Sequence, residues 1–240
     1  MRRLSAALLA CLIPLPLPLQ ADAVHPTLMF PQNLAPELQG LPRLAGDDAI
    51  ERKINASLQT EDKALLSSRQ DCIKEPVSDF SSWSDVTLSG PEFLSIRLTI
   101  SYYCGGFHPD SGQSVLLFDL KTGDRLDPMT LLPHSLQPDT TSDSASTATD
   151  AALAGIPALT ALYLSRATLD PSTDADCLHS LASYDHLSFL VWPDAKAHAL
   201  MLMPNGMAYV DTPCQNPVAI PVELLLKLHA SPRLILSLAR

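Results

Sequence analysis

The residues best placed for chemistry lie between Tyr103 and Asp110, in the run Tyr-Cys-Gly-Gly-Phe-His-Pro-Asp. A histidine between a Gly-Gly pair and a Pro-Asp turn has the right type and setting to line a pocket or accept a proton. His108 lacks the orienting partner that a catalytic base requires, so a turn histidine that fixes the loop backbone is the favoured interpretation. Phe107 is expected to face solvent. We therefore predict a binding surface of Tyr103, Phe107, His108 and Asp110, and we assign no catalytic residue.

Other motifs for catalysis, metal binding or phosphate binding are missing from the sequence. It has no Gly-x-Ser-x-Gly elbow for a serine nucleophile and no Gly-rich loop between a strand and a helix. His179 and His186 are seven residues apart, which is not a metal-ligand spacing, and no Cys-x-x-Cys is present. We therefore expect neither a cofactor nor a metal ion.

The charge balance restricts the kinds of partner. The formal net charge is −10, with 26 acidic residues against 16 Lys and Arg. Such a surface repels phosphate backbones and anionic lipid head groups, so we expect no nucleic acid partner and no membrane-surface binding. A basic protein partner is permitted, although solubility alone is a sufficient reason for an acidic surface.

Residues 1–23 have the pattern of a secretory signal peptide. Arg2-Arg3 precede an apolar run, and Ala21-Asp22-Ala23 fits the small-x-small cleavage rule. The prolines in the apolar run disfavour an uncleaved spanning helix. We therefore predict an exported, periplasmic protein. Leu8-Leu9-Ala10-Cys11 also resembles a lipobox, so a lipoprotein attached through Cys11 is the alternative.

Removal of this segment leaves four of the five cysteines, Cys72, Cys104, Cys177 and Cys214. An even number in an exported chain indicates two disulfides, for which three pairings exist. A hairpin around Gly90-Pro91 brings Cys104 towards Cys72. We therefore favour Cys72–Cys104 and Cys177–Cys214, each within its own half of the chain.

The apolar periodicity predicts an α+β fold, a mostly antiparallel sheet packed with two or three helices. A long half-buried strand is expected near its centre, over 93–104, because apolar and polar residues alternate there. Gly123 is expected to supply the positive φ of a hairpin turn. Further strands are predicted over 83–89, 114–120, 187–192, 199–203, 207–210 and 218–220.

Helices are predicted over 47–60, capped by Asp47-Asp48, over 151–166, and from Pro221 onward. Pro157 either kinks the second helix or lies in the first turn of one that starts later. The Ser/Thr/Asp-rich run 137–150 is expected to be a loop. Residues 24–240 form one exported domain, and a division into halves 24–104 and 105–240 stays open.

Four segments carry a resemblance to a known family: Tyr102–Pro109, Phe118–Gly123, Leu131-Leu132 and Ala219–Leu225. Together they resemble the ectodomain of RsiV-type lysozyme-sensing anti-sigma factors, a domain also similar to the N-terminal region of PdaC-type peptidoglycan deacetylases. The resemblance implies an exported α+β module that binds proteins or cell-wall material and has no catalytic activity. Phe107 departs from the family pattern, in which alanine is usual.

These observations lead to three hypotheses. The first is a non-enzymatic periplasmic binding module that contacts a cell-envelope protein, such as a lysozyme-like wall hydrolase, or peptidoglycan. An inhibitor or immunity-type protein falls in this class. The second is a periplasmic hydrolase with His108 as base, and the third is a structural envelope protein without a discrete ligand.

Overall fold

A computed structural model describes residues 25–74, 77–137, 157–171, 173–184 and 187–239. The predicted signal peptide with Cys11, and residues 138–150 of the predicted loop, lie outside the described residues. The fold is α+β with antiparallel sheets, as predicted.

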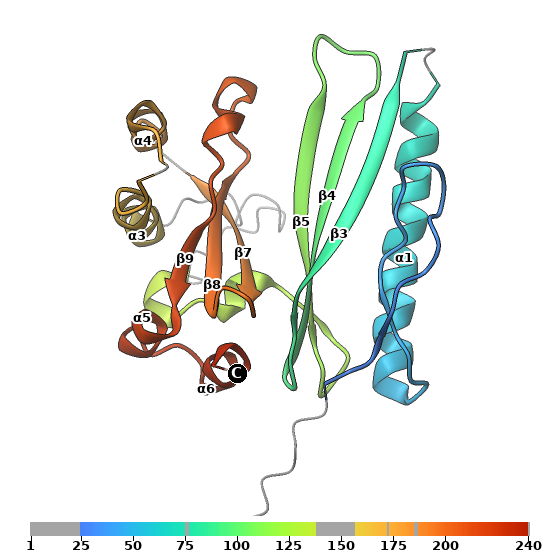
Figure 1. Cartoon of the computed structure of the whole chain (residues 1–240), viewed down its shortest axis with the longest axis horizontal. Coiled ribbons are helices and arrows are strands. Elements are labelled where there is room, and N and C mark those ends of the chain that lie inside the picture. The colour runs from blue at the N-terminus through green and yellow to red at the C-terminus, as the bar shows by residue number, and fades with distance from the viewer. Residues whose placement is uncertain (1–24, 75–76, 138–156, 172, 185–186, 240) are drawn as a thin grey trace, which may run out of the picture.

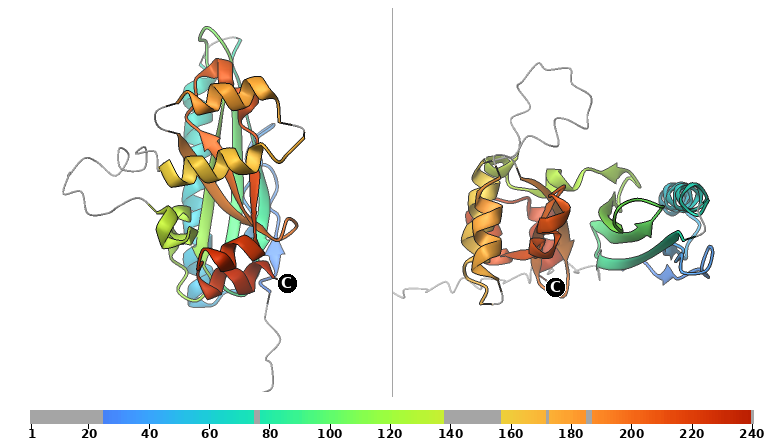
Figure 2. Two further views of the ribbon diagram at one scale, coloured as in Figure 1. Left: turned by 90° about the vertical axis from the view of Figure 1, so that its left-hand side faces the viewer. Right: turned by 90° about the horizontal axis from the view of Figure 1, so that it is seen from above.

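Figures 1 and 2 show four layers: helix α1, the sheet β3-β4-β5-β6, the sheet β7-β8-β9, and helices α3 and α4. Helices α5 and α6 lie together at one end of the second sheet (Figure 1). The helices are α1 (Ala49–Cys72), α3 (Pro157–Ala167), α4 (Ala175–Ala182), α5 (Val222–Lys227) and α6 (Pro232–Leu238), with 3₁₀ turns η1 (Pro128–Leu131), η2 (His134–Leu136) and η3 (Tyr209–Cys214). The strands are β1 (Leu28–Met29), β2 (Arg43–Leu44), β3 (Asp79–Ser89), β4 (Phe93–Tyr103), β5 (Asp110–Asp119), β6 (Arg125–Leu126), β7 (Ser188–Asp194), β8 (Ala199–Asn205) and β9 (Val218–Pro221).

Helix α1 is longer than predicted. It begins after its N-cap Asp48 as expected, but it continues to Cys72 instead of ending near residue 60. The second half of the helix looks polar in the sequence because its buried stripe includes Asp62. The Asp62 carboxylate accepts the N–H of Leu41 at 3.0 Å and pairs with Arg43. A buried carboxylate needs such partners, and here they come from a distant segment that helical periodicity cannot reveal.

The prediction of a half-buried central strand is wrong for the first part of β4. Leu94 and Ile96 pack in a hydrophobic cluster with residues of α1. Phe93, on the opposite side of the strand, packs in the second cluster with residues of the other sheet. Even Ser95 is fully buried, and its hydroxyl bonds with that of Thr87 at 2.8 Å. The second sheet covers the face that the alternating pattern assigns to solvent.

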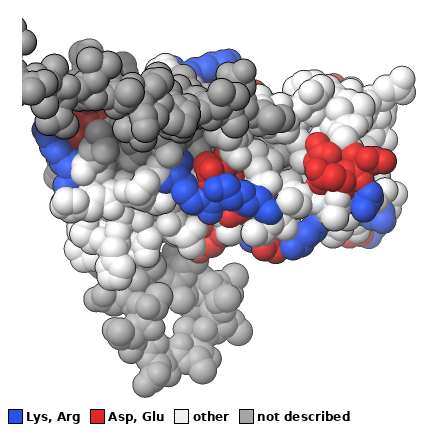
Figure 3. Space-filling model, turned by 90° about the horizontal axis from the view of Figure 1, so that it is seen from below, with Lys and Arg blue, Asp and Glu red and all other residues white. Residues whose placement is uncertain are grey.

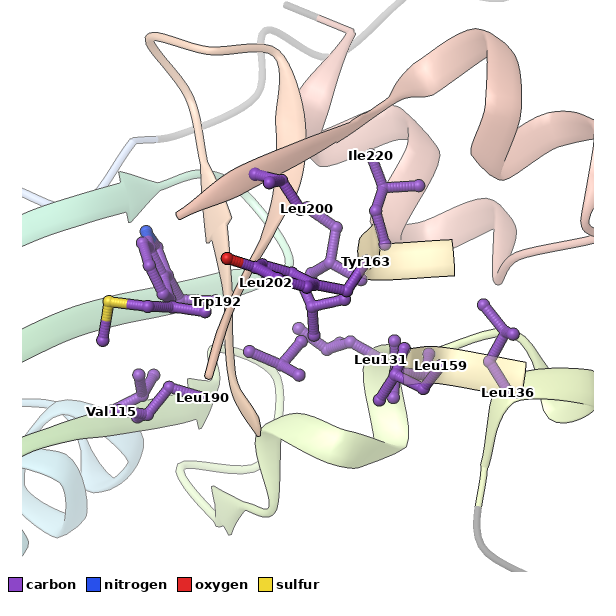
Figure 4. Packing of buried hydrophobic residues seen from close by; sticks show 14 of the residues in the cluster. Val115, Leu131, Leu136, Leu159, Tyr163, Leu190, Trp192, Leu200, Leu202 and Ile220 are labelled. Carbon is purple, nitrogen blue, oxygen red and sulfur yellow. The ribbon is translucent and has the colours of Figure 1, made fainter. Parts of the chain in front are cut away.

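Trp192 of β7 lies between the two sheets and is only 1% exposed. The Arg97 guanidinium of β4 lies 5.2 Å from the centre of the indole ring. Figure 4 shows Trp192 near Val115 and Leu190, while Tyr163 of α3 packs on the other side of the second sheet. The main core is therefore continuous from the first sheet to α3.

The predicted strand over 207–210 is wrong, because residues 209–214 form the 3₁₀ turn η3. The Asp211 carboxylate accepts the hydroxyls of Ser180 and Tyr184, each at 2.6 Å, and holds this turn against α4. The other predicted strands of this half form β7, β8 and β9. Pro157 stands at the start of α3, the second of its two predicted roles.

Helix α6 is attached to the first sheet by an ionic cluster around Arg233. Arg233 pairs with Glu92 and with Asp119 (2.8 Å), and Lys121 also pairs with Glu92 at 2.9 Å. Asp119 in addition accepts the N–H of Lys121 in the hairpin turn, where Gly123 has φ +71°. Figure 3 shows acidic and basic side chains side by side on the face of the molecule seen from below.

The Arg233 cluster should make stability depend on pH in the acid range. Burial raises the pKa of Glu92, but hydrogen bonds from Lys121 and Arg233 lower it further, so the net shift is downward. The bond from Arg233 lowers the pKa of Asp119. Lowered carboxyl pKa values stabilise the fold above the pKa of the unfolded chain, and the stabilisation is lost as pH falls through the folded pKa. Urea midpoints should therefore drop below about pH 4.

In Arg233→Met this acid-range drop should be shallower than in the wild type, since the partner that Glu92 and Asp119 share is removed. Lys74→Met, which removes an exposed pair with Asp71, is the matched control and should follow the wild-type curve. Parallel curves for the wild type and Arg233→Met between pH 3 and 7 would contradict this assignment.

The two tryptophans should differ sharply in their contribution to stability. Trp192→Ala opens a cavity between the sheets and should lower the free energy of unfolding by about 3–5 kcal/mol. Trp83 is 46% exposed, and Trp83→Ala should cost no more than about 1 kcal/mol. Urea unfolding followed by circular dichroism measures both, and similar losses for the two variants would show that Trp192 does not join the layers.

Candidate functional site

Two segments distant in sequence meet at one end of the molecule, the β4–β5 loop and η3. The imidazole of His108 stacks on the ring of Tyr209, with 4.0 Å between ring centres and 20° between planes. Phe107, which precedes His108, is fully exposed, and Val210, which follows Tyr209, is 80% exposed. We name Phe107, His108, Asp110, Tyr209 and Val210 the tip surface.

Local hydrogen bonds hold the β4–β5 loop in shape. Tyr103 donates its hydroxyl to the carbonyl oxygen of Gly106 at 3.0 Å, and His108 Nδ1 donates to that of Pro109 at 2.9 Å. Gly105 has φ +85°, a conformation that glycine adopts without strain. The predicted residues Tyr103 and His108 therefore both contact the loop backbone, while Phe107 makes no such contact and points into solvent.

Asp110 lies at the end of the loop, where β5 begins. It accepts the Tyr102 hydroxyl at 3.3 Å and the N–H of Ser111 at 2.7 Å. Burial, with the nearby Asp110 charge, raises the pKa of Tyr102, so this phenol stays protonated and donates. Asp110 is thus oriented towards Tyr102, and it is not a hydrogen-bond partner of His108.

The side chains of the tip surface are suited to binding another molecule. His108 bonds to a carbonyl oxygen, and among the described residues no nucleophile is bonded to its ring. No group of three or more His, Cys, Asp or Glu in the described part of the chain could hold a metal ion. The exposed groups are an aromatic ring, an aliphatic side chain and a carboxylate, which suit recognition of another molecule.

A disulfide anchors each of the two tip segments. Cys104 directly precedes Gly105 and is bonded to Cys72 at the end of α1, with 4.6 Å between Cα atoms. Cys214 ends η3 and is bonded to Cys177 in α4, with 5.2 Å between Cα atoms. The favoured pairings are both present, and both bridges support the same end of the molecule.

Tyr209 and Val210 are the tip residues that sequence reasoning missed. The run Met207–Val210 suggested a buried strand because it is apolar, yet Tyr209 is 50% exposed. Gly206 before it and Pro213 after it were the available signals for a turn. Trp192, the other tryptophan besides the exposed Trp83, is not part of this surface and lies in the core.

No family model matches the sequence, and the search of curated proteins finds no match. Among solved structures, a member of the DUF3298 family from Bacteroides fragilis is similar with a TM-score of 0.48 and 16% identity, over 82% of this chain and 85% of that one. A DUF3298 family protein from Pseudomonas aeruginosa PAO1 has a TM-score of 0.46 and 17% identity, over 80% and 84% of the two chains. Within the described residues, no helix has the length and apolar character that crossing a membrane requires.

Removing the Cys72–Cys104 bridge should loosen the tip. For a separation of 32 residues, the chain-entropy model gives a loss of about 3–4 kcal/mol in the double variant Cys72→Ser/Cys104→Ser. Amide hydrogen exchange should accelerate over 104–110, and Cys177→Ser/Cys214→Ser is the matched control, in which exchange should accelerate over 207–214 instead. Unchanged exchange over 104–110 in the first variant would contradict the anchoring role.

Proposed function

We propose that the protein is an exported, non-enzymatic binding module whose tip surface contacts a cationic protein of the cell envelope, such as a lysozyme-like wall hydrolase. The observation that carries the proposal is Phe107, a fully exposed aromatic side chain on a braced loop beside the exposed Tyr209 and Val210. Large apolar side chains gathered on a rigid surface are typical of interaction sites.

The charge around the tip surface supports a cationic partner. Neither 98–120 nor 197–226, the stretches that contain the two tip segments, includes a Lys or Arg. Asp110 and Asp211 lie in these stretches, and the whole chain has a net charge of −10. A cationic protein would be attracted to this end over several ångströms, while an anionic one would be repelled.

The bracing of the tip surface also supports binding. Two disulfides and the stack of His108 on Tyr209 fix the two segments before any partner arrives. A surface ordered in advance loses less conformational entropy on association, so more of the contact free energy appears as affinity.

The proposal predicts measurable binding to hen lysozyme or to a cationic wall hydrolase from the same envelope. Calorimetry should give a dissociation constant in the micromolar range or tighter, weakened by added salt. Phe107→Ala should weaken this binding by about tenfold or more, because it removes the exposed anchor. Leu226→Ala, at a leucine on α5 that is 56% exposed, is the control and should bind like the wild type.

Two results would overturn this function: no binding to any cationic envelope protein at micromolar concentrations, or equal binding by Phe107→Ala and the wild type. Inhibition of the hydrolase is a separate readout in the same experiment. It distinguishes an inhibitor from a module that only holds its partner.

A further inference from the structure

One face of the first sheet points towards the second sheet, and its side chains change from apolar to polar along the strands. At the α6 end it is apolar, and Phe93, Val115 and Leu117 pack into the core there. Beyond Arg97, which contacts Trp192, the side chains on this face become polar around one tryptophan. We name this set the polar face: Ser81, Trp83, Thr99, Ser101, Ser111 and Gln113.

The strand register places these residues on one surface. Trp83 pairs with Thr99, which pairs in turn with Gln113 across β4. Directly paired residues point to the same side of a sheet, and Thr99 is two residues from Arg97, so it shares the side that meets β7. The three-strand row from Trp83 to Gln113 spans about 10 Å.

Trp83 is the unusual member of the polar face. Its side chain is 46% exposed, whereas the other tryptophan, Trp192, is 1% exposed on the facing sheet. Beside it Arg97 and Asp85 form an ion pair at 3.1 Å, so these charges compensate each other. The result is a half-exposed aromatic ring with the compensated Arg97–Asp85 pair on one side along the strands and Ser81 and Ser101 on the other.

A pocket of about 200 Å³ opens at the end of the polar face that is nearest to the tip surface. The β4–β5 side lines it with Ser101, Pro109, Asp110 and Ser111, and η3 lines it with Tyr209 and Thr212. Its walls therefore offer several hydroxyl groups and a second aromatic ring, which is half-exposed. Trp83 and this pocket lie on the same side of the sheet, two residue levels apart along the strands.

We propose that the polar face and its pocket bind a neutral oligosaccharide of pyranose rings. A pyranose has an apolar C–H face that packs on an aromatic ring and a rim of hydroxyls that require hydrogen-bond partners. Trp83 and Tyr209 supply rings, while Ser101, Ser111 and Gln113 supply donors and acceptors. An anionic ligand would need a cation, and the nearby Arg97 is already paired with Asp85. A protein partner would instead require a more apolar centre.

This site shares Asp110 and Tyr209 with the tip surface, but Trp83 belongs to the sugar site alone and Phe107 to the tip surface alone, so variants at these two residues separate the two proposals. The test uses the whole exported protein with chitotetraose and, in parallel, cellotetraose. Because the chain has 2 tryptophans and one is buried, acrylamide quenching reports mainly on Trp83. A bound sugar should protect Trp83 from quenching in a saturable manner, and calorimetry should give the same affinity.

Trp83→Ala should weaken sugar binding by about tenfold or more, and Trp83→Tyr should recover part of it, since a ring is restored. Calorimetry serves for these two variants, because they lack the fluorescent reporter. Phe107→Ala should bind the sugar like the wild type even if it loses the protein partner. Urea unfolding shows that each variant is folded.

Absence of protection by both sugars at millimolar concentration would overturn the oligosaccharide site. Equal sugar affinity in Trp83→Ala and the wild type would overturn it as well. Loss of protein binding in Phe107→Ala has no bearing on this site, so failure of one proposal can be told from failure of the other.

Discussion

The burial of Trp192 between the two sheets is the contact on which the arrangement of the layers depends. The indole packs in the main core and lies under the Arg97 guanidinium of the first sheet. No described residue accepts a hydrogen bond from its Nε1, so the ring is held by packing and by the cation–π contact. The N–H of Ala195 bonds to Thr87 O at 2.8 Å and joins the backbones close by. Both contacts lie towards the α6 end.

The position of that contact explains why the side chains between the two sheets are apolar at one end and polar at the other. Where the sheets pack together, the facing side chains are apolar or, like Ser95 and Thr87, bonded to each other. Towards the tip the facing side chains are polar, and hydrophobic packing no longer fixes the distance between the layers. The Cys72–Cys104 and Cys177–Cys214 disulfides hold the chain at this end.

Local chemistry made several parts of this fold predictable from the sequence. Asp48 before an apolar stripe and Gly123 in a hairpin act through neighbouring backbone atoms and have the expected roles. Pro157 starts a helix, which is one of the two roles predicted for it. Burial that depends on distant partners was not predictable. From its residue type alone, Asp62 is expected at the surface, but it is buried because Arg43 pairs with it. Ser95 is also expected at the surface, but the second sheet covers it.

The same distinction applies to the candidate site. Residues 105–110 form one continuous loop, so its Gly-Gly pair and its aromatic and histidine side chains could be recognised together in the sequence. Tyr209 comes from a segment about a hundred residues later, and only the fold places its ring against His108.

The two tryptophans show most clearly where prediction from sequence ends, because hydropathy assigns both the same tendency to be buried. Trp192 packs in the main core and is enclosed, whereas Trp83 lies beside Ser81, Thr99 and the Arg97–Asp85 ion pair and stays half-exposed. The surroundings of each ring, set by strand register, decide whether it stabilises the core or remains available to a ligand.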